Sequence, residues 1–454
     1  MPDRVRHDSF FFIPLPAFPL PASTLPAPHP ERAATAMLAG QVLCMLGMAS
    51  YTVLLPTLQR EWALSNAGSG LIGSGFFLGY ICTVTFWSTL TDRMDARRIY
   101  MIGCATSCLG LAMFGLLAQG LWTALLAHMI YGVGVSATYM PGLKILSDRY
   151  QGAKQSRVFS FYTAFYGLGG AISLAATQFL ADTLGWREAF MVVAVGPVVA
   201  MVLVARLTRQ QAATPVAPYT GAGERDSSQA EPTATHRPTW RDAFPLQAWL
   251  AVLRHERSRR FIIGYTVHCL EMFGARGWSV AFLVFAAGAG VAQAGASRLP
   301  LAAGTIAALA SLCSVGASIL GNEAALRFGR ERWIRISMLV SSLLGVAMAA
   351  CAAAPWPLLL ALVLFYQLAV MSDSATLTAG LVEASEPGRR GAALGLYSLM
   401  GFGGGMLGPA LFGVALDATG GGRTAASWVA GYALLGLGCL AFSLQQFYSR
   451  SGRA

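Results

Sequence analysis

The sequence predicts an all-α integral membrane protein in which twelve transmembrane helices form two pseudo-symmetric bundles of six. Its composition, the spacing of its apolar runs and an internal repeat each support this fold class. Of its 454 residues, 55% are hydrophobic and only 12% are charged, whereas soluble domains carry about 25% charged residues. A soluble chain of this length would form about two or three domains, and this one has too few polar side chains to cover them.

The apolar runs have the length and number that twelve spans require. A transmembrane helix needs about 20 mostly apolar residues. The runs cover 37–58, 67–90, 99–118, 121–146, 158–181 and 188–206, and then 261–286, 300–322, 334–354, 356–380, 392–416 and 425–447. They predict one six-helix bundle over residues 37–206 and a second over residues 261–448.

Three segments lie outside the predicted bundles. Residues 1–36 form a Pro-rich N-terminal arm that we expect to be disordered and not a signal peptide, and Met37 is an alternative start to Met1. Residues 207–260 form a cytoplasmic linker, whose part from 249 to 260 suits either a basic amphipathic helix on an anionic membrane face or a plain helical connector. Residues 449–454 form a short C-terminal tail.

The basic residues predict the orientation of the chain. There are 32 Lys and Arg against 21 Asp and Glu, but they lie in short clusters between apolar runs, which excludes a nucleic-acid-binding face. With both termini in the cytoplasm, 26 of the 32 fall on the cytoplasmic side and four on the other. Because positive residues accumulate in cytoplasmic loops, we expect a multi-pass protein of the inner (plasma) membrane with both termini inside.

The two halves repeat each other at one offset. A shift of 235 residues places Arg97 on Arg332 and Asp182 on Asp417. The same shift pairs Tyr162 with Tyr397, Gly169 with Gly404, Gly170 with Gly405 and Gly185 with Gly420. Such repeats are typical of secondary carriers, whose binding site lies between the halves near the middle of the membrane.

The sequence motifs do not indicate an enzyme, a metal site or a cofactor. The eight cysteines lie inside apolar runs without metal-ligand spacing. The G-x-G-x-x-G matches at Gly68 and Gly403 lie within predicted spans and not after a strand, so we exclude dinucleotide binding. His268 and Glu271 form HxxE and not HExxH. A membrane-embedded enzyme or a sensor remains a distant alternative.

The loop between the second and third spans resembles the signature loop of the major facilitator superfamily. It reads Asp92-Arg93-Met94-Asp95-Ala96-Arg97-Arg98, although Ser88 and Asp95 stand where that family often has glycine. The resemblance extends over about residues 37–448. It implies that Asp92, with Arg93, Arg97 and Arg98, holds the cytoplasmic side closed, through an arginine or a helix N-terminus. The alternative is a purely topogenic role, which we favour for Arg97 and Arg98.

Ionisable side chains within the apolar runs are candidates for the functional site, because each costs about 2.5–3.5 kcal/mol at membrane depth. The candidates for binding substrate or protons are Glu271, Asp373, Arg276, His268, Lys144 and Gln41. His268 and Glu271, three residues apart, share a helix face. Arg276 lies five residues beyond Glu271, about 140° round an ideal helix. His128 is expected to be a packed helix residue.

Two roles are open for these charges. In the first, Glu271 or Asp373 takes and releases a proton, while Arg276 or Lys144 clamps a substrate carboxylate, which the planar guanidinium group suits well. In the second, these four side chains neutralise one another and fix the helix packing. For Lys144, snorkelling towards the cytoplasmic surface is a further alternative.

The function expected from these features is secondary active transport of a small organic solute by alternating access. We expect proton-coupled symport, with an organic anion as one substrate class, and Glu271→Gln is then expected to abolish pH-driven uptake. A multidrug or metabolite efflux antiporter is the alternative, because 24 Phe, 14 Tyr and 10 Trp could line a permissive cavity. The expected partners are the solute, a proton and the lipid bilayer, and we expect the chain to act as a monomer.

Overall fold

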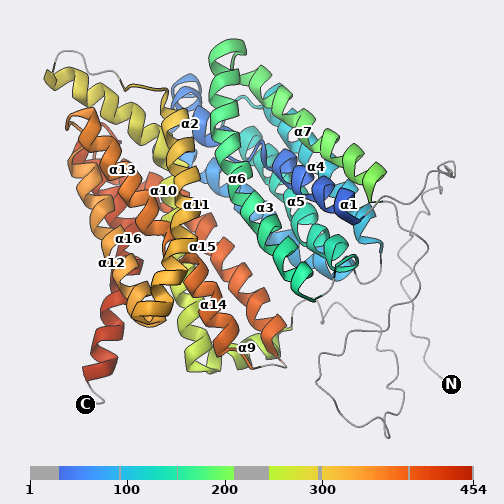
Figure 1. Cartoon of the computed structure of the whole chain (residues 1–454). Helices are drawn as coiled ribbons and strands as arrows, with labels where there is room; N and C mark the ends of the chain where they lie inside the picture. The colour runs from blue at the N-terminus through green and yellow to red at the C-terminus, as the bar shows by residue number, and fades with distance from the viewer. Residues whose placement is uncertain are drawn as a thin grey trace, which may run out of the picture.

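The computed structural model describes residues 30–91, 94–150, 152–208, 245–294, 299–386 and 389–451. Twelve of its helices are long and apolar enough to cross a membrane, as predicted, and no predicted span end lies more than about six residues from the observed one. The helices form two bundles, which are blue to green and yellow to red in Figure 1. The N-terminal arm up to residue 29 and the linker residues 209–244 lie outside the described residues.

The N-terminal bundle contains the first six spans, the first of which is interrupted. A turn at residues 46–49 divides the first span into two helices. The helices are α1 (Pro30–Met45), α2 (Ser50–Glu61), α3 (Asn66–Leu90), α4 (Ala96–Leu117), α5 (Leu121–Ser147), α6 (Gly152–Leu184) and α7 (Trp186–Leu207). Polar caps define two of the starts, because the side chain of Ser65 accepts from Gly68 N and that of Asp95 accepts from Arg97 N, both at 3.0 Å.

The C-terminal bundle contains the other six spans, of which the tenth is interrupted at residues 372–373. The helices are α10 (Glu256–Ala294), α11 (Ala303–Phe328), α12 (Arg330–Ala350), α13 (Trp356–Met371), α14 (Ser374–Ala384), α15 (Arg390–Ala418) and α16 (Ala425–Ser451). The short helix α9 (Leu246–Arg254) precedes them. Its residues Trp249 and Val252 are buried against this bundle, whereas Leu246 and Leu250 are exposed.

The connections between the helices lie at two opposite ends of the molecule. One end, here called the basic end, carries α9 and the connections around Asp95, Arg149, Gly329 and Arg389. The opposite end, here called the distal end, carries the connections at residues 62–65, 118–120, 299–302, 351–355 and 419–424. Helices α2 and α9 lie at opposite ends in Figure 1.

The halves meet mainly where α3 packs on α15 and α6 packs on α11. Small residues allow the backbones to touch at the distal end of the first seam, as is common between membrane helices. A side chain at Gly70 of α3 would collide with the Pro409 carbonyl of α15, and a side chain at Gly413 would collide with the Asn66 carbonyl. The two halves are therefore in direct backbone contact on this side of the molecule.

Candidate functional site

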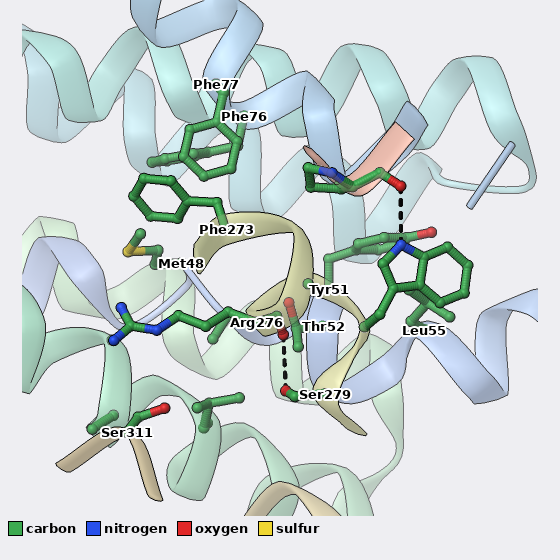
Figure 2. Close-up of a pocket in the computed structure, with 18 of the residues that line it drawn as sticks. Met48, Tyr51, Thr52, Leu55, Phe76, Phe77, Phe273, Arg276, Ser279 and Ser311 are labelled. Carbon is green, nitrogen blue, oxygen red and sulfur yellow. Dashed lines mark hydrogen bonds between the residues drawn. The ribbon is translucent and has the colours of Figure 1, made fainter. Parts of the chain in front are cut away.

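A cavity lies between the two halves, with walls from α2, α3, α5 and α6 on one side and α10, α11 and α15 on the other. Figure 2 shows part of its lining. Its volume is about 130 Å³, close to the roughly 150 Å³ in which an engineered protein cavity binds benzene. The cavity therefore has room for a small organic molecule.

Aromatic side chains from both halves contribute to the cavity wall. Phe77 of α3 and Phe273 of α10 pack across the two halves with ring centroids 4.6 Å apart. The polar atoms of two further wall residues are already used, since Trp278 Nε1 donates to the Pro409 carbonyl at 2.9 Å and the Tyr51 hydroxyl donates to the Ser69 carbonyl at 2.9 Å. These rings therefore present apolar surface to a ligand.

Three polar side chains of the wall have atoms without a hydrogen-bond partner among the described residues: Arg276 Nε, the Tyr166 hydroxyl and His128 Nε2. Arg276 uses one other nitrogen, Nη2, to donate to Ser314 Oγ at 3.2 Å. It extends between Phe273 and Ser311 (Figure 2), and Tyr166 of the other half lines the same cavity. An unsatisfied buried polar group costs about 1–3 kcal/mol, so the three in this wall make the cavity the candidate ligand site.

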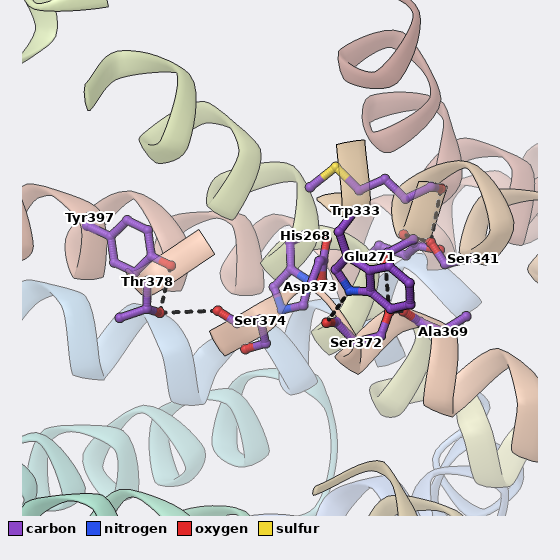
Figure 3. Close-up of polar contacts among 12 residues, drawn as sticks. His268, Glu271, Trp333, Ser341, Ala369, Ser372, Asp373, Ser374, Thr378 and Tyr397 are labelled. Carbon is purple, nitrogen blue, oxygen red and sulfur yellow. Dashed lines mark hydrogen bonds and ion pairs between the residues drawn. The ribbon is translucent and has the colours of Figure 1, made fainter. Parts of the chain in front are cut away.

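A second polar cluster lies inside the C-terminal half. His268 Nδ1 of α10 lies 2.8 Å from Asp373 Oδ1, and both side chains are only 2% exposed. Glu271, one turn along α10, accepts a hydrogen bond from Ser341 Oγ of α12 at 2.9 Å. Figure 3 shows the three titratable side chains side by side. None of them belongs to the lining of the central cavity.

The cluster lies at the interruption of the tenth span. The carbonyl of Ser372 accepts from Trp333 Nε1 at 3.0 Å, and its hydroxyl donates to Ser337 Oγ at 2.8 Å, so α12 holds the interrupted segment. Met371, two residues before Asp373, lines the cavity. The interruption therefore connects the cavity wall with the His268–Asp373 pair.

The remaining polar candidates lie away from the cavity. Lys144 Nζ lies 3.4 Å from Asp148 Oδ1 near the basic end, where its side chain is 40% exposed. Gln41 is completely buried in the N-terminal half, and neither its amide nitrogen nor its amide oxygen has a partner in the described part of the chain. Lys144 and Arg276 thus contact Asp148 and Ser314, and the structure brings neither of them to Glu271 or Asp373.

The predicted gating loop is described only in part, because Asp92 and Arg93 lie outside the described residues. The guanidinium group of Arg97 donates to the Ala205 carbonyl of α7, which joins two helices of the same half. Arg98 is exposed. The gating role of the loop stays a prediction, and the contact of Arg97 fits the structural role that we favour for it.

The distal end carries two polar contacts between the halves that the search for intramembrane charges did not single out. The Asp417 carboxylate at the end of α15 accepts from Asn66 N at 3.1 Å, Asn66 Nδ2 at 2.7 Å and Ala67 N at 2.8 Å, at the start of α3. At the second seam, Gln178 Oε1 of α6 accepts from Gly304 N of α11 at 3.0 Å. Both acceptors cap a helix N-terminus of the other half, which attracts negative charge.

The repeat relates these two contacts. Gln178 Nε2 donates to both oxygens of Asp182, at 2.9 and 3.0 Å, and Asp182 is the residue that the 235-residue shift aligns with Asp417. The 235-residue repeat, which aligns Asp182 with Asp417, was therefore the one feature of the sequence that pointed to Asp417. No comparable signal marked Tyr166, and His128 was expected only to pack.

The fold and the central cavity define a membrane transporter. The sequence profile of the Major Facilitator Superfamily matches residues 37–302, and the chain belongs to this family. Over 154 residues it is 28% identical to the Multidrug resistance protein Stp of Mycobacterium tuberculosis, which covers 34% of this chain and 28% of that protein. It is 24% identical to human Synaptic vesicle glycoprotein 2A over 132 residues, 29% of this chain and 18% of that protein.

Solved structures share the fold over nearly the whole chain. A variant of the nucleoside transporter NupG superposes with a TM-score of 0.69 at 15% identity, over 91% of this chain and 98% of that one. A bacterial homolog of the human lysosomal transporter Spinster, in an inward-facing and unoccupied conformation, superposes with a TM-score of 0.63 at 16% identity, over 91% and 94%. These structures share the fold, and the profile match over residues 37–302 makes the chain a multi-pass membrane transporter of this superfamily.

Proposed function

We propose that the chain transports a small organic anion by alternating access, coupled to protons as a symporter. One observation carries this proposal: a guanidinium nitrogen of Arg276 and the hydroxyl of Tyr166, which line the same cavity from opposite halves, both lack a hydrogen-bond partner within the described parts of the chain. An anion that accepts hydrogen bonds from both groups would bind to both halves at once. Binding would then respond to the relative movement of the halves, as alternating access requires.

The cavity also favours a particular class of anion. Its aromatic wall suits an apolar body, and its volume suits about one ring. Arg276 is the one residue with a permanent charge in the described lining, which contains no Asp or Glu. A carboxylate or sulfonate on a small aromatic body therefore fits this site.

Efflux of drug-like compounds is the second candidate. The likeness to a multidrug resistance protein and the aromatic wall support it. A lipophilic cation in this cavity would lie near the positive charge of Arg276. The described wall has no carboxylate to compensate this repulsion, so cations are disfavoured. We therefore rank the anion first, and efflux of neutral compounds second.

Binding of three probes of similar size tests the substrate class. Benzenesulfonate is expected to bind the purified protein at least about tenfold more tightly than neutral benzenesulfonamide, because it adds a charge-assisted hydrogen bond of about 1.5–3 kcal/mol. Benzylamine is expected not to bind. Isothermal titration calorimetry measures all three, and tighter binding of benzylamine or benzenesulfonamide would remove the anion proposal.

The charges at the two ends support an orientation. We propose that the basic end faces the cytoplasm, because 26 of the 32 basic residues fall on that side. The described contacts of Asp417 and Gln178 join the halves at the distal end. In this orientation, the distal contacts close the cavity towards the outside.

The buried cluster is the proposed proton-dependent element of the conformational change. The Glu271 carboxylate is 3% exposed and accepts from the Ser341 hydroxyl, with the side chains of Tyr366 and Cys439 also within hydrogen-bond reach. Since a buried carboxylate is costly when ionised and cheap when protonated, a proton here changes how α10 and α12 pack. The His268–Asp373 pair would transmit this change to the interrupted tenth span.

Glu271→Gln is expected to abolish uptake of benzenesulfonate driven by a pH gradient in membrane vesicles, because an amide cannot exchange a proton. Glu323→Gln, at an exposed position near the basic end, is the matched control and is expected to transport normally. Radiolabelled probe and vesicles of both orientations give the readout. Full gradient-driven uptake by the Glu271 variant would remove the cluster from the coupling mechanism.

A further inference from the structure

His128 of α5 occupies an unusual place in the cavity wall. Its side chain is only 4% exposed, yet it lines the cavity. Rings from three other helices surround it, with centroid distances of 5.7 Å to Tyr51, 5.9 Å to Phe76 and 6.1 Å to Phe114. Tyr131 on its own helix stacks at 6.3 Å. The imidazole is therefore held in one position by aromatic packing.

One hydrogen bond fixes which ring nitrogen carries the hydrogen. His128 Nδ1 lies 2.8 Å from the Ile72 carbonyl oxygen of α3. A carbonyl oxygen can only accept, so Nδ1 must be the donor. In the neutral ring, Nε2 then carries a lone pair and no hydrogen. This nitrogen has no hydrogen-bond partner among the described residues.

We propose that His128 Nε2 binds the proton that enters the cavity together with the anion. This inference rests on the proposed transport of an anion. A proton on Nε2 converts the imidazole to an imidazolium, while the Nδ1–H···O bond to Ile72 stays intact, so protonation needs no movement of the ring. The protonated ring would then carry a hydrogen on Nε2 as well as on Nδ1.

The charges around the ring make proton binding depend on the anion. The titratable residues whose rings pack on His128 are Tyr51 and Tyr131, whose hydroxyls donate to the Ser69 and Cys44 carbonyls, and Arg276 is the charged residue of the same cavity wall. With the cavity empty, the positive charge of Arg276 in the same wall would oppose a second one on His128. A bound anion cancels that effect, so anion and proton favour each other's binding by the same factor. The net charge of the site stays the same when both bind.

This arrangement gives the two titratable sites separate tasks. His128 takes up a proton in the binding step, at the cavity itself. The Glu271 cluster lies behind the cavity and acts in the conformational step. Measurements of binding and of gradient-driven transport therefore report on different residues.

Proton uptake on binding can be measured directly with benzenesulfonate, which stays ionised, so that any proton taken up belongs to the protein. Titration calorimetry in two buffers with different ionisation enthalpies gives the number of protons taken up per anion bound. The slope of log affinity against pH gives the same number independently. The unmodified protein is expected to take up as much as about one proton per anion, with affinity rising up to about tenfold for each unit by which the pH falls. In His128→Gln, the anion is expected to bind without proton uptake and with an affinity independent of pH.

The controls separate this inference from its alternatives. His255→Gln, at an exposed position before α10, is expected to retain the proton uptake, and His128→Asn serves as a second variant if the first unfolds. Proton uptake that persists in the His128 variants, or that disappears in Glu271→Gln instead, would overturn the role of His128 and leave anion transport standing. Absence of anion binding by the unmodified protein would overturn both.

Discussion

Replacing Arg276 by glutamine is expected to weaken benzenesulfonate binding at least about 30-fold and to abolish its transport. The reason is the loss of a buried cationic donor, which typically costs about 2 kcal/mol or more. Arg276→Lys is expected to give an intermediate loss, because an ammonium group keeps the charge but lacks the planar fork. Calorimetry and vesicle uptake measure both effects.

The stability of the same variant distinguishes a binding role from a structural one. The guanidinium group is held by one described hydrogen bond, to Ser314, and its Nε has no partner among the described residues. Removing a buried, unpaired charge is expected to leave the unfolding temperature unchanged or to raise it. Ser279→Ala is the matched control in the same wall, because its hydroxyl donates to the Arg276 carbonyl, and it is expected to bind the probe normally. A clear loss of stability in Arg276→Gln would favour a packing role.

Replacing Asp417 by alanine is expected to open the distal end about fivefold more often. The change removes three hydrogen bonds to the start of α3. Because Asp417 is exposed, we assign the contact about 1 kcal/mol, the upper range for an exposed carboxylate at a helix N-terminus. A cysteine at Thr52, in the cavity wall, would report this opening through its rate of labelling by an impermeant maleimide added outside intact cells.

Two further results complete this experiment. Thr419→Ala, two residues beyond Asp417 and bonded within its own helix, is the matched control and is expected to label at the original rate. An unchanged rate in Asp417→Ala would show that the carboxylate does not hold the halves together. Faster labelling only in everted vesicles would show that the distal end faces the cytoplasm, which would reverse the proposed orientation.

The fold was accessible from the sequence because the membrane imposes a length and a composition on every span. Each of the twelve runs needs about 20 apolar residues, so the spans could be counted without any knowledge of their packing. The interruptions at residues 46–49 and 372–373 were not predicted. They follow from contacts between helices, such as those that α12 makes with Ser372.

The candidate site could be predicted only in part. Helical periodicity predicts which residues share one face of a helix, but it does not predict which other helix that face contacts. The angle of about 140° between Glu271 and Arg276 on an ideal helix left open whether they would meet. It did not indicate that Arg276 faces the other half while Glu271 faces α12. His128 had the same limitation, since Tyr51 and Phe76, which pack on its ring, and Ile72, whose carbonyl it contacts, are far from it in the sequence.

The backbone contact between α3 and α15 has a consequence for energy conservation in the cell. At this seam, Gly70 lies against the Pro409 carbonyl and Gly413 lies against the Asn66 carbonyl. A barrier made of main chain has no side chain that can rotate to let an ion slip through. In the proton-coupled transport that we propose, the closed seam would therefore oppose leakage of the proton gradient at this point, so that the gradient drives the movement of solute.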